Sequence, residues 1–155
     1  MTIFIADTET NGIHNPSIIW VLGILDYETN EYTSYTGDQI PDGLLRLAEA
    51  DVIIGHNWRK YDAIHITRLT DGLITFPDEK VVDTLELSRK LVRMNSHSLD
   101  TWGEFFQLPK IKDTIPGFDV FHPNMVPYCQ RDCEITTRVF SLLTEMHNEK
   151  YGVPF

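Results

Sequence analysis

Two carboxylates stand at the end of the first apolar run of the chain. Asp7 and Glu9 follow Ile3-Phe4-Ile5-Ala6, a run typical of a short buried strand that leads into a turn. Since successive side chains of a strand alternate between faces, Asp7 and Glu9 point the same way. Two neighbouring carboxylates repel each other unless they are protonated or share a cation. By itself, this short motif is equally compatible with two solvated loop acids.

A third carboxylate lies just beyond another apolar run. Asp62 closes the segment Gly55-His56-Asn57-Trp58-Arg59-Lys60-Tyr61-Asp62, which follows a strand predicted over residues 52–55. In open α/β sheets, functional groups collect outside the carboxyl ends of the strands. Acidic side chains at two strand ends therefore favour a shared site, although Asp62 would also suit the start of a helix.

A tyrosine and an aspartate are one helical turn apart near the end of the chain. Pro127 suits the first turn of a helix predicted over residues 127–146. Side chains four residues apart share one face of a helix, so the phenol and the carboxylate project together. Such a pair is common in proteins, and its meaning depends on the other acids. The complete ordered set is Asp7, Glu9, Asp62, Tyr128 and Asp132.

This ordered set resembles the DEDD (DnaQ-like) superfamily of 3′→5′ exonucleases, in its tyrosine-bearing branch, DEDDy. The closest likeness is to the proofreading exonuclease domain of phage-type family A DNA polymerases, and it spans nearly the whole chain. Tyr128 stands where the sister branch has a histidine nearer the final aspartate. Those domains continue into a polymerase, so a polymerase fragment is an alternative to a separate nuclease. The segments that carry the resemblance are residues 6–12, 55–62, 82–89, 96–103 and 128–132.

The resemblance implies a phosphodiester hydrolase that uses two divalent cations, Mg²⁺ or Mn²⁺. Mg²⁺ prefers oxygen ligands, so carboxylates suffice, and a metal pair stabilises both the attacking and the leaving oxygen. The phenol of Tyr128, with an ordinary pKa of about 10, is expected to orient the attacking water rather than to act as the base. The implied metal ligands are Asp7, Glu9, Asp62 and Asp132.

The resemblance also implies which residues meet the substrate. Residues 10–12 follow the acidic pair, where the family binds the 3′-terminal nucleotide. In the second motif, Trp58 is the aromatic residue most suited to stacking on a base. Turn-forming, packed or solvated roles are the alternatives for all of these residues. The expected substrate-binding residues are Thr10, Asn11, Gly12, Asn57, Trp58 and Lys60.

We therefore expect a metal-dependent 3′→5′ exonuclease that releases nucleoside 5′-monophosphates from the 3′ ends of single-stranded DNA. A separately encoded DNA polymerase would be its partner if it proofreads in trans. Two alternatives stay open: a 3′→5′ exoribonuclease that trims RNA, and a non-catalytic nucleic-acid-binding module on the same fold. The complete set of four carboxylates and a tyrosine disfavours the binding module.

The net charge of the chain is opposite to what binding of nucleic acid by charge alone would need. Thirteen basic and 23 acidic residues give −10. Cations bound by the carboxylates would reverse the local field. An acidic body suits an enzyme that holds a few terminal nucleotides and then releases them. The basic residues that partly cluster, and could line a path for the strand, are Arg59, Lys60, Arg89, Lys90 and Arg93.

The 155 residues correspond in length to one domain, residues 1–155, and their pattern indicates an α/β class. Strands are predicted over residues 3–6, 18–25, 31–35 and 52–55, and helices over 41–48, from 61 onward, over 99–106 and over 127–146. Together they indicate a mixed sheet flanked by helices. The resemblance implies the ribonuclease-H-like version of this fold, with about five strands.

The remaining features concern the cysteines and the surroundings of the protein. Cys129 and Cys133 are too few for a disulfide framework, and no second pair supports zinc, so both are expected to be buried small hydrophobes. Apolar runs are much shorter than a membrane span, and the first residues lack the basic region of a signal peptide. We expect a monomer without membrane contact in the cytoplasm, or in the host cytoplasm if the gene is phage-encoded.

Overall fold

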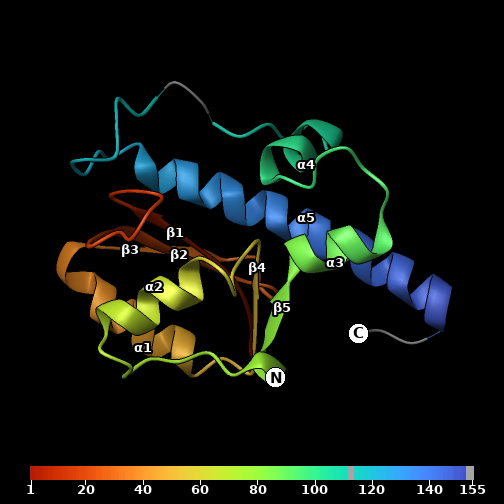
Figure 1. Ribbon diagram of the computed structural model, residues 1–155, viewed down its shortest axis with the longest axis horizontal. Coiled ribbons are helices and arrows are strands. Elements are labelled where there is room, and N and C mark those ends of the chain that lie inside the picture. Colours follow the sequence, from red (N-terminus) through yellow and green to blue (C-terminus); the bar gives the residue numbers. More distant parts are fainter. Residues whose placement is uncertain (112–113, 153–155) are drawn as a thin grey trace.

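A five-stranded sheet forms the centre of the computed structural model, which describes residues 1–111 and 114–152. The strand order is β3-β2-β1-β4-β5 (Figure 1). β2 pairs antiparallel with both β1 and β3, whereas β4 is parallel to β1 and β5 is parallel to β4. The expected mixed sheet is thereby confirmed. The strands are β1 (Ile3–Thr10), β2 (Ile19–Asp26), β3 (Tyr32–Thr36), β4 (Val52–Gly55) and β5 (Val81–Asp83).

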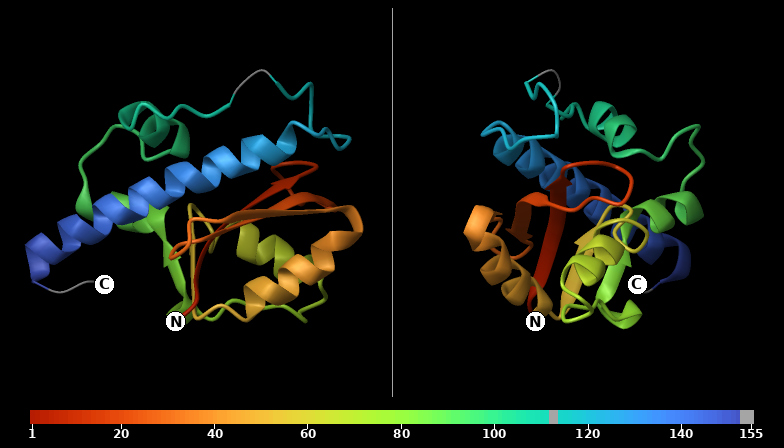
Figure 2. Two further views of the ribbon diagram at one scale, coloured as in Figure 1. Left: turned by 180° about the vertical axis from the view of Figure 1, so that it is seen from behind. Right: turned by 60° about the vertical axis from the view of Figure 1, so that its left-hand side comes forward.

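Helices cover both faces of this sheet. The long helix α5 crosses one face, and α1 and α2 lie against the opposite face (Figures 1 and 2). α3 packs on α5 beside β5, and α4 lies on the outer side of α5. Short 3₁₀ helices occupy Gly37–Gln39 and Asp78–Lys80. The α-helices are α1 (Ile40–Ala48), α2 (Asp62–Leu69), α3 (Thr84–Leu91), α4 (Leu99–Phe105) and α5 (Met125–Tyr151).

The alternation of side chains along β1 divides the core into two layers. Phe4 and Ala6 belong to the cluster formed with α1 and the residues before and within α2. Ile5 belongs to the cluster on the other face, together with Cys133 of α5. Because both layers are apolar, the sheet is buried on its two faces and β1 is held at its centre. Cys129 and Cys133 are both fully buried, as expected.

Three elements differ from the expectation. The turn expected after Ala6 is wrong, because β1 continues to Thr10 and pairs with β2 as far as Ile19. The short strand β5 has three residues, too few for a periodic pattern to reveal. The last helix begins at Met125, two residues before Pro127, which therefore sits in its first turn. The end of the chain beyond Gly152 lies outside the described residues.

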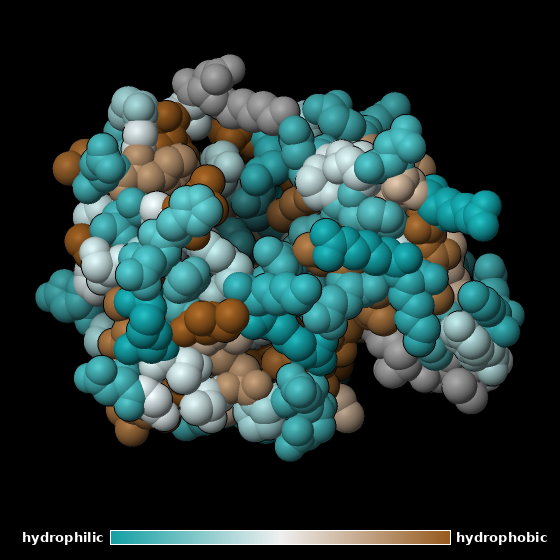
Figure 3. All heavy atoms as spheres, in the orientation of Figure 1, coloured by the Kyte–Doolittle hydropathy of each residue, from teal (hydrophilic) through white to brown (hydrophobic). Residues whose placement is uncertain are grey.

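The face of the molecule seen in Figure 3 is mostly hydrophilic, with apolar side chains scattered over it. Ile13 and Leu73 are among the most exposed large apolar residues. Within the described part of the chain, no helix combines the length and the apolar character that a membrane span needs.

Candidate active site

Strand β1 turns Asp7 and Glu9 toward helix α5. Ile5, two residues before Asp7, packs with Cys133 of α5, so Asp7 and Glu9 share the α5 face of the strand. Glu9 is only 8% exposed. The two carboxylates therefore lie between the sheet and the helix, as the strand alternation predicted, and are not solvated loop acids.

Helix α5 brings the tyrosine and the last aspartate to the same place. Tyr128 and Asp132 lie one turn apart, and both line a pocket with Asp7 and Glu9. Asp132 is 5% exposed, and its Oδ1 is buried without a hydrogen-bond partner among the described residues. An unpaired buried carboxylate oxygen is costly, so this atom requires a partner that the described residues do not supply.

Asp62 reaches the site from the other face of β1. It opens α2, which begins directly after the segment that follows β4. Thr8 lies between Asp7 and Glu9 but points to the α2 face, and its Oγ1 donates a hydrogen bond of 2.5 Å to Asp62 Oδ1. Asp62 is 3% exposed. The strand thus holds acids on both of its sides at one end.

Burial changes the protonation of these four carboxylates. It raises the pKa of Asp7 to about 7, with a further rise from Asp62, and raises the pKa of Asp62 to about 7. Burial and the charge of Asp7 raise the pKa of Asp132 to about 8. Burial followed by the charges of Asp7 and Asp132 raises the pKa of Glu9 well above its usual range. In the absence of a cation, the cluster thus retains protons near neutral pH.

Lys110 is a site residue that the sequence patterns did not reveal. Its Nζ lies 3.4 Å from Asp132 Oδ2 and 5.1 Å from the centre of the Tyr128 ring. Burial alone would lower the pKa of Lys110, but the Asp132 carboxylate raises it above its ordinary value. Lys110 belongs to the segment between α4 and α5, where no periodicity or motif marks it. A lysine in an irregular segment carries no local signal of this role.

The carboxylates of Asp7, Glu9 and Asp132 open onto a pocket of about 350 Å³, whereas Asp62 does not line it. Its rim is apolar on two sides: Ile13 of the loop between β1 and β2 is 78% exposed, and the Phe118 ring packs edge-on against Tyr128 at 6.2 Å. The pocket therefore has an acidic floor and an apolar mouth. Its lining residues are Asp7, Thr8, Glu9, Thr10, Gly12, Ile13, Tyr61, Lys110, Phe118, Tyr128 and Asp132.

Of the three residues expected at the terminal nucleotide, two line the pocket and one does not. Thr10 and Gly12 line the pocket, and Tyr61, which sequence reasoning left out, donates a 2.7 Å hydrogen bond to the carbonyl of Gly12. Asn11 instead closes its own loop: its Oδ1 accepts bonds from the backbone N–H groups of Ser17 and Ile18. Asn11 is not among the residues that line the pocket, and its expected contact with the substrate stays a prediction.

The substrate-binding residues expected in the second motif lie in three different places. Trp58 is 0% exposed and packs edge-on against Phe76 in the core, so the expectation that it stacks on a base is wrong. Asn57, in the left-handed region at φ 61°, lines a separate polar pocket that includes Arg89. Lys60 is exposed and does not line the acidic pocket.

The side chain of Arg59 is bound within the protein. Its guanidinium pairs with Asp78 and Glu86 and donates to the carbonyl of Val81. These bonds tie the segment after β4 to the start of β5. The side chain therefore has a structural role, and its expected place along a nucleic-acid path stays a prediction.

The donor groups of the site fit divalent cations. Asp7, Glu9 and Cys129 each offer one ligand atom, and these atoms all lie within 4.8 Å of one another. The unpaired Oδ1 of Asp132 adds a carboxylate oxygen that has no other partner in the described chain. Hard cations such as Mg²⁺ or Mn²⁺ take such oxygen ligands. A divalent cation would also neutralise the negative charge of the carboxylates, which bound protons otherwise neutralise.

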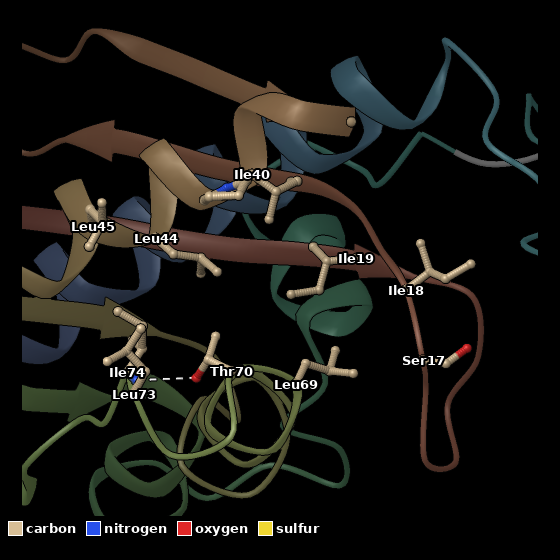
Figure 4. Close-up of a pocket in the computed structure, with 12 residues that line it drawn as sticks. Ser17, Ile18, Ile19, Ile40, Leu44, Leu45, Leu69, Thr70, Leu73 and Ile74 are labelled. Atoms are coloured by element: carbon tan, nitrogen blue, oxygen red, sulfur yellow. Dashed lines mark hydrogen bonds between the residues drawn. The ribbon is translucent and has the colours of Figure 1, made fainter.

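A larger apolar pocket lies on the face of the sheet that α1 and α2 cover, and it has no carboxylates that could bind a cation. It has a volume of about 480 Å³, and it lies between the start of β2, helix α1 and the end of α2. Figure 4 shows Ile18 and Ile19, Leu44 and Leu45, and Leu73 around it. No residue that lines it is charged, so it is not a centre for hydrolysis.

Comparison with known proteins places the chain in a family. A model of the RNase H superfamily matches residues 4–123. A search of curated proteins found no match. Solved structures give a consistent result: Brucella melitensis NrnC with bound Mg²⁺ has a TM-score of 0.69 at 17% identity, with 96% of this chain and 74% of NrnC covered.

Two other solved structures resemble only parts of longer chains. The catalytic core of RRP6 from Trypanosoma brucei has a TM-score of 0.69 at 16% identity, and covers 96% of this chain and 42% of its own. Phi29 DNA polymerase in complex with primer-template DNA has a TM-score of 0.57 at 14% identity, with 97% of this chain and 31% of the polymerase covered. The chain thus spans less than half of either protein.

At these identities the likeness to solved structures is one of fold, and it confirms the ribonuclease-H-like architecture expected from the motifs. The family model, in contrast, covers most of the sequence, from β1 through the segment before α5. The protein belongs to the RNase H superfamily.

Proposed function

We propose that this protein is a metal-dependent 3′→5′ exonuclease that releases nucleoside 5′-monophosphates from single-stranded ends. One observation carries the proposal: acidic side chains from β1 and α5, which are far apart in the sequence, line one pocket with a tyrosine and a lysine. The carboxylate of Asp62 adjoins this pocket through its hydrogen bond with Thr8. A folded protein does not gather unpaired acids without a cation or a proton to compensate them. Phosphodiester hydrolysis by two divalent cations is the chemistry that uses such a set.

Asp7, Glu9 and Asp132 would hold the cation that carries the attacking water, and Asp62 would serve the second cation through water. When bound, the cations lower the pKa of the attacking water and stabilise the leaving oxygen. Tyr128 is half-buried beside Lys110, and burial keeps its pKa above the ordinary value. A neutral phenol at this position can donate to, and orient, the attacking water.

The shape of the pocket supports an end-directed enzyme. A volume of about 350 Å³ lies at the small end of ligand pockets, which suits one terminal nucleotide rather than a duplex. Ile13 and Phe118 offer apolar surface for the terminal base. Thr10 and the backbone of Gly12 lie beside them and could contact the sugar.

The proposed substrate is DNA, and RNA is the alternative that the experiment has to separate. The resemblance to polymerase-borne exonucleases favours DNA, and phi29 DNA polymerase in its complex with primer-template DNA shares the fold. NrnC, which also shares the fold, has been solved bound to pGG, a short ligand that suits a small pocket. The same proposal includes proofreading in trans for a separately encoded DNA polymerase.

Digestion of end-labelled strands tests the proposal directly. Linear single-stranded DNA, the matched RNA and a closed circular DNA are incubated with Mg²⁺, Mn²⁺ or a chelator. We expect stepwise loss of nucleoside 5′-monophosphates from linear strands only, dependence on the metal, and loss of activity in Asp7→Asn. Cleavage of the circle at the linear rate would show an endonuclease instead, and faster digestion of RNA would make the protein an exoribonuclease.

A further inference from the structure

The apolar pocket between α1 and the end of α2 is open to solvent along its border. Leu44 and Ile74 are buried inside it, whereas Leu45 is 56% and Leu73 is 82% exposed. Figure 4 shows the side chains of α1 facing those at the end of α2, with Ile18 at one end of the pocket. The pocket therefore presents large apolar side chains that the described chain does not cover.

Acidic side chains surround the exposed part of this pocket. On α1, two of them stand three residues before and four residues after Leu45, so they are its neighbours on the helix surface. A third precedes Leu73 by two residues, and a fourth follows Gly37, which lines the pocket. All four are exposed, and none pairs with a basic residue that the structure describes. This acidic border consists of Asp42, Glu49, Asp71 and Asp38.

The arginines of α1 and α2 are held by other contacts. The Arg46 guanidinium lies 4.7 Å from the centre of the Phe4 ring and donates a hydrogen bond to the Tyr35 hydroxyl. The Arg68 guanidinium donates to the carbonyl of Pro16. Apolar surface with a polar border marks an interaction site on a soluble protein. Here the border is negative, so it attracts a basic partner and repels phosphate and anionic lipid.

Charge also decides against a second copy of this chain as the occupant. A two-fold axis places the same patch of each copy against itself, so one acidic border would face the other. Each copy carries a net charge of −10, which opposes this contact further. The walls of the pocket are largely helix side chains, which suit the apolar face of an amphipathic helix with anchors at positions i, i+3 or i+4, and i+7.

We propose that this pocket docks an amphipathic helical segment of a second protein, whose apolar side chains enter between α1 and α2 while its lysine or arginine side chains pair with the acidic border. The volume of about 480 Å³ lies within the range of binding pockets. The loop that brings Ser17 and Ile18 to this pocket also carries Ile13 to the acidic pocket, so the docked protein lies beside the candidate active site. The inference goes beyond the proposed function and does not depend on hydrolysis.

Selection of displayed peptides tests the chemistry of the occupant. A library of helical peptides of about 16 residues, or about four turns, is selected on the wild-type protein. Peptides that bind the double variant Leu45→Ser/Leu73→Ser are removed first. We expect the selected peptides to carry apolar residues at helical spacing with an excess of lysine and arginine beside them. Selection of acidic peptides, or of none, overturns the inference.

Fluorescence anisotropy of a labelled selected peptide measures the apolar contribution. We expect Leu45→Ser/Leu73→Ser to raise the dissociation constant at least about tenfold. Both side chains are exposed, and thermal melting verifies that the variant is folded. Ile64→Ser is the matched control, because Ile64 is an exposed residue of α2 outside the lining and its loss should leave the affinity unchanged. Equal affinity of the wild type and the double variant contradicts the docking site.

The same peptide measures the contribution of charge. Asp42→Asn/Asp71→Asn is expected to weaken binding and to reduce its dependence on salt, since two charges of the border are removed. Glu28→Gln is the control, because Glu28 is an exposed acid in the turn after β2, at the end of that strand away from the pocket. An affinity and a salt dependence that the border variant leaves unchanged would contradict the role of the acidic border.

Light scattering and vesicle flotation test the other occupants. We expect the protein alone to be a monomer and to stay unbound to vesicles of phosphatidylcholine or phosphatidylglycerol. A dimer that Leu45→Ser/Leu73→Ser dissociates would make a second copy the occupant. Vesicle binding that the same variant loses would make this pocket a membrane contact. Either result overturns the inference, and neither bears on whether the protein hydrolyses nucleic acid.

Discussion

Asp132 divides its two carboxylate oxygens between different surroundings. Oδ2 lies 3.4 Å from the Lys110 ammonium, whereas Oδ1 is buried with no hydrogen-bond partner among the described residues. A partner on one oxygen only leaves most of the cost of burying the charge uncompensated. Oδ1 is therefore the atom at which a cation would be stabilised most.

The first prediction separates Asp132 from its neighbour Tyr128. Tyr128→Phe removes a single hydroxyl, and it is expected to slow hydrolysis by about 10²–10⁴-fold while the affinity for Mn²⁺ stays nearly the same. Asp132→Asn should lower both the rate of hydrolysis and the affinity for Mn²⁺, because an amide cannot supply the negative charge. Calorimetric titration of Mn²⁺ into the two variants, with rates measured beside it, makes the comparison. If Tyr128→Phe loses metal as severely as Asp132→Asn, the phenol is not a group that orients water.

A second prediction concerns Lys110, which contacts both residues. Lys110→Met keeps much of the side-chain volume but removes the charge next to Asp132 and Tyr128. We expect hydrolysis to slow by about 10–100-fold, as is typical when a group that supports metal ligands is lost. Mn²⁺ should bind at least as tightly, because a competing positive charge has gone. Lys110→Arg is the charge-preserving control; an unchanged rate in Lys110→Met would show that the lysine is only structural.

At the scale of elements, the segment between β4 and α2 does more than present Asp62. Trp58 turns inward and packs under β4, where a Cβ on Gly55 would lie 2.9 Å from the indole. Asp83, at the end of β5, accepts hydrogen bonds from the backbone N–H groups of Asn57 and Arg59. The end of β5 thus fixes the shape of the segment that follows the neighbouring strand β4. The position of Asp62 depends on this packing.

Truncation of Trp58 measures that dependence and is the third prediction. Trp58→Ala is expected to lower the free energy of unfolding by about 3–5 kcal/mol, since it removes a large, fully buried side chain. Ile64→Ala on α2 is the control, because Ile64 is 52% exposed and should cost much less. Urea denaturation of both variants provides the numbers. A Trp58→Ala protein with wild-type stability and only an increased KM would restore the base-stacking role.

At the scale of the whole molecule, the acidic cluster links stability to pH and to metal. The net charge is −10, and burial already raises the pKa of Asp7 and Asp62 to about 7 and that of Asp132 to about 8. A carboxyl group whose pKa is higher in the folded state binds more protons when folded. Its contribution to stability is therefore present at low pH and is lost as the pH rises from about 4 toward 8.

The fourth prediction follows from this linkage. In chelator, the melting temperature should fall between about pH 5.5 and pH 8, and Mg²⁺ or Mn²⁺ should restore it at the higher pH. Asp7→Asn should melt higher than the wild type in chelator at about pH 8, by about 2–4 °C for each kcal/mol regained, and should respond less to metal. Calorimetric melting across this range provides the test. A melting temperature that rises with pH in chelator, with no response to metal, would contradict the electrostatic account of the site.

Much of the site could be predicted from spacing alone. Strand alternation placed Asp7 and Glu9 on one face, and helical periodicity placed Tyr128 and Asp132 together; both placements are confirmed. The α/β class and the long last helix followed from local patterns of apolar and polar residues. These features are predictable because the periods of a strand and of a helix are set by the backbone within a few residues.

Other features depended on contacts between distant segments. Lys110 reached Asp132 from an irregular segment, and Cys129 met Asp7 across the space between sheet and helix. Trp58 was buried although its neighbours are polar, and β1 continued past Ala6 because β2 provided hydrogen bonds along its whole length. Burial and pairing are properties of what lies opposite a residue in the folded chain. No pattern confined to neighbouring residues contains that information, so only the tertiary structure could decide them.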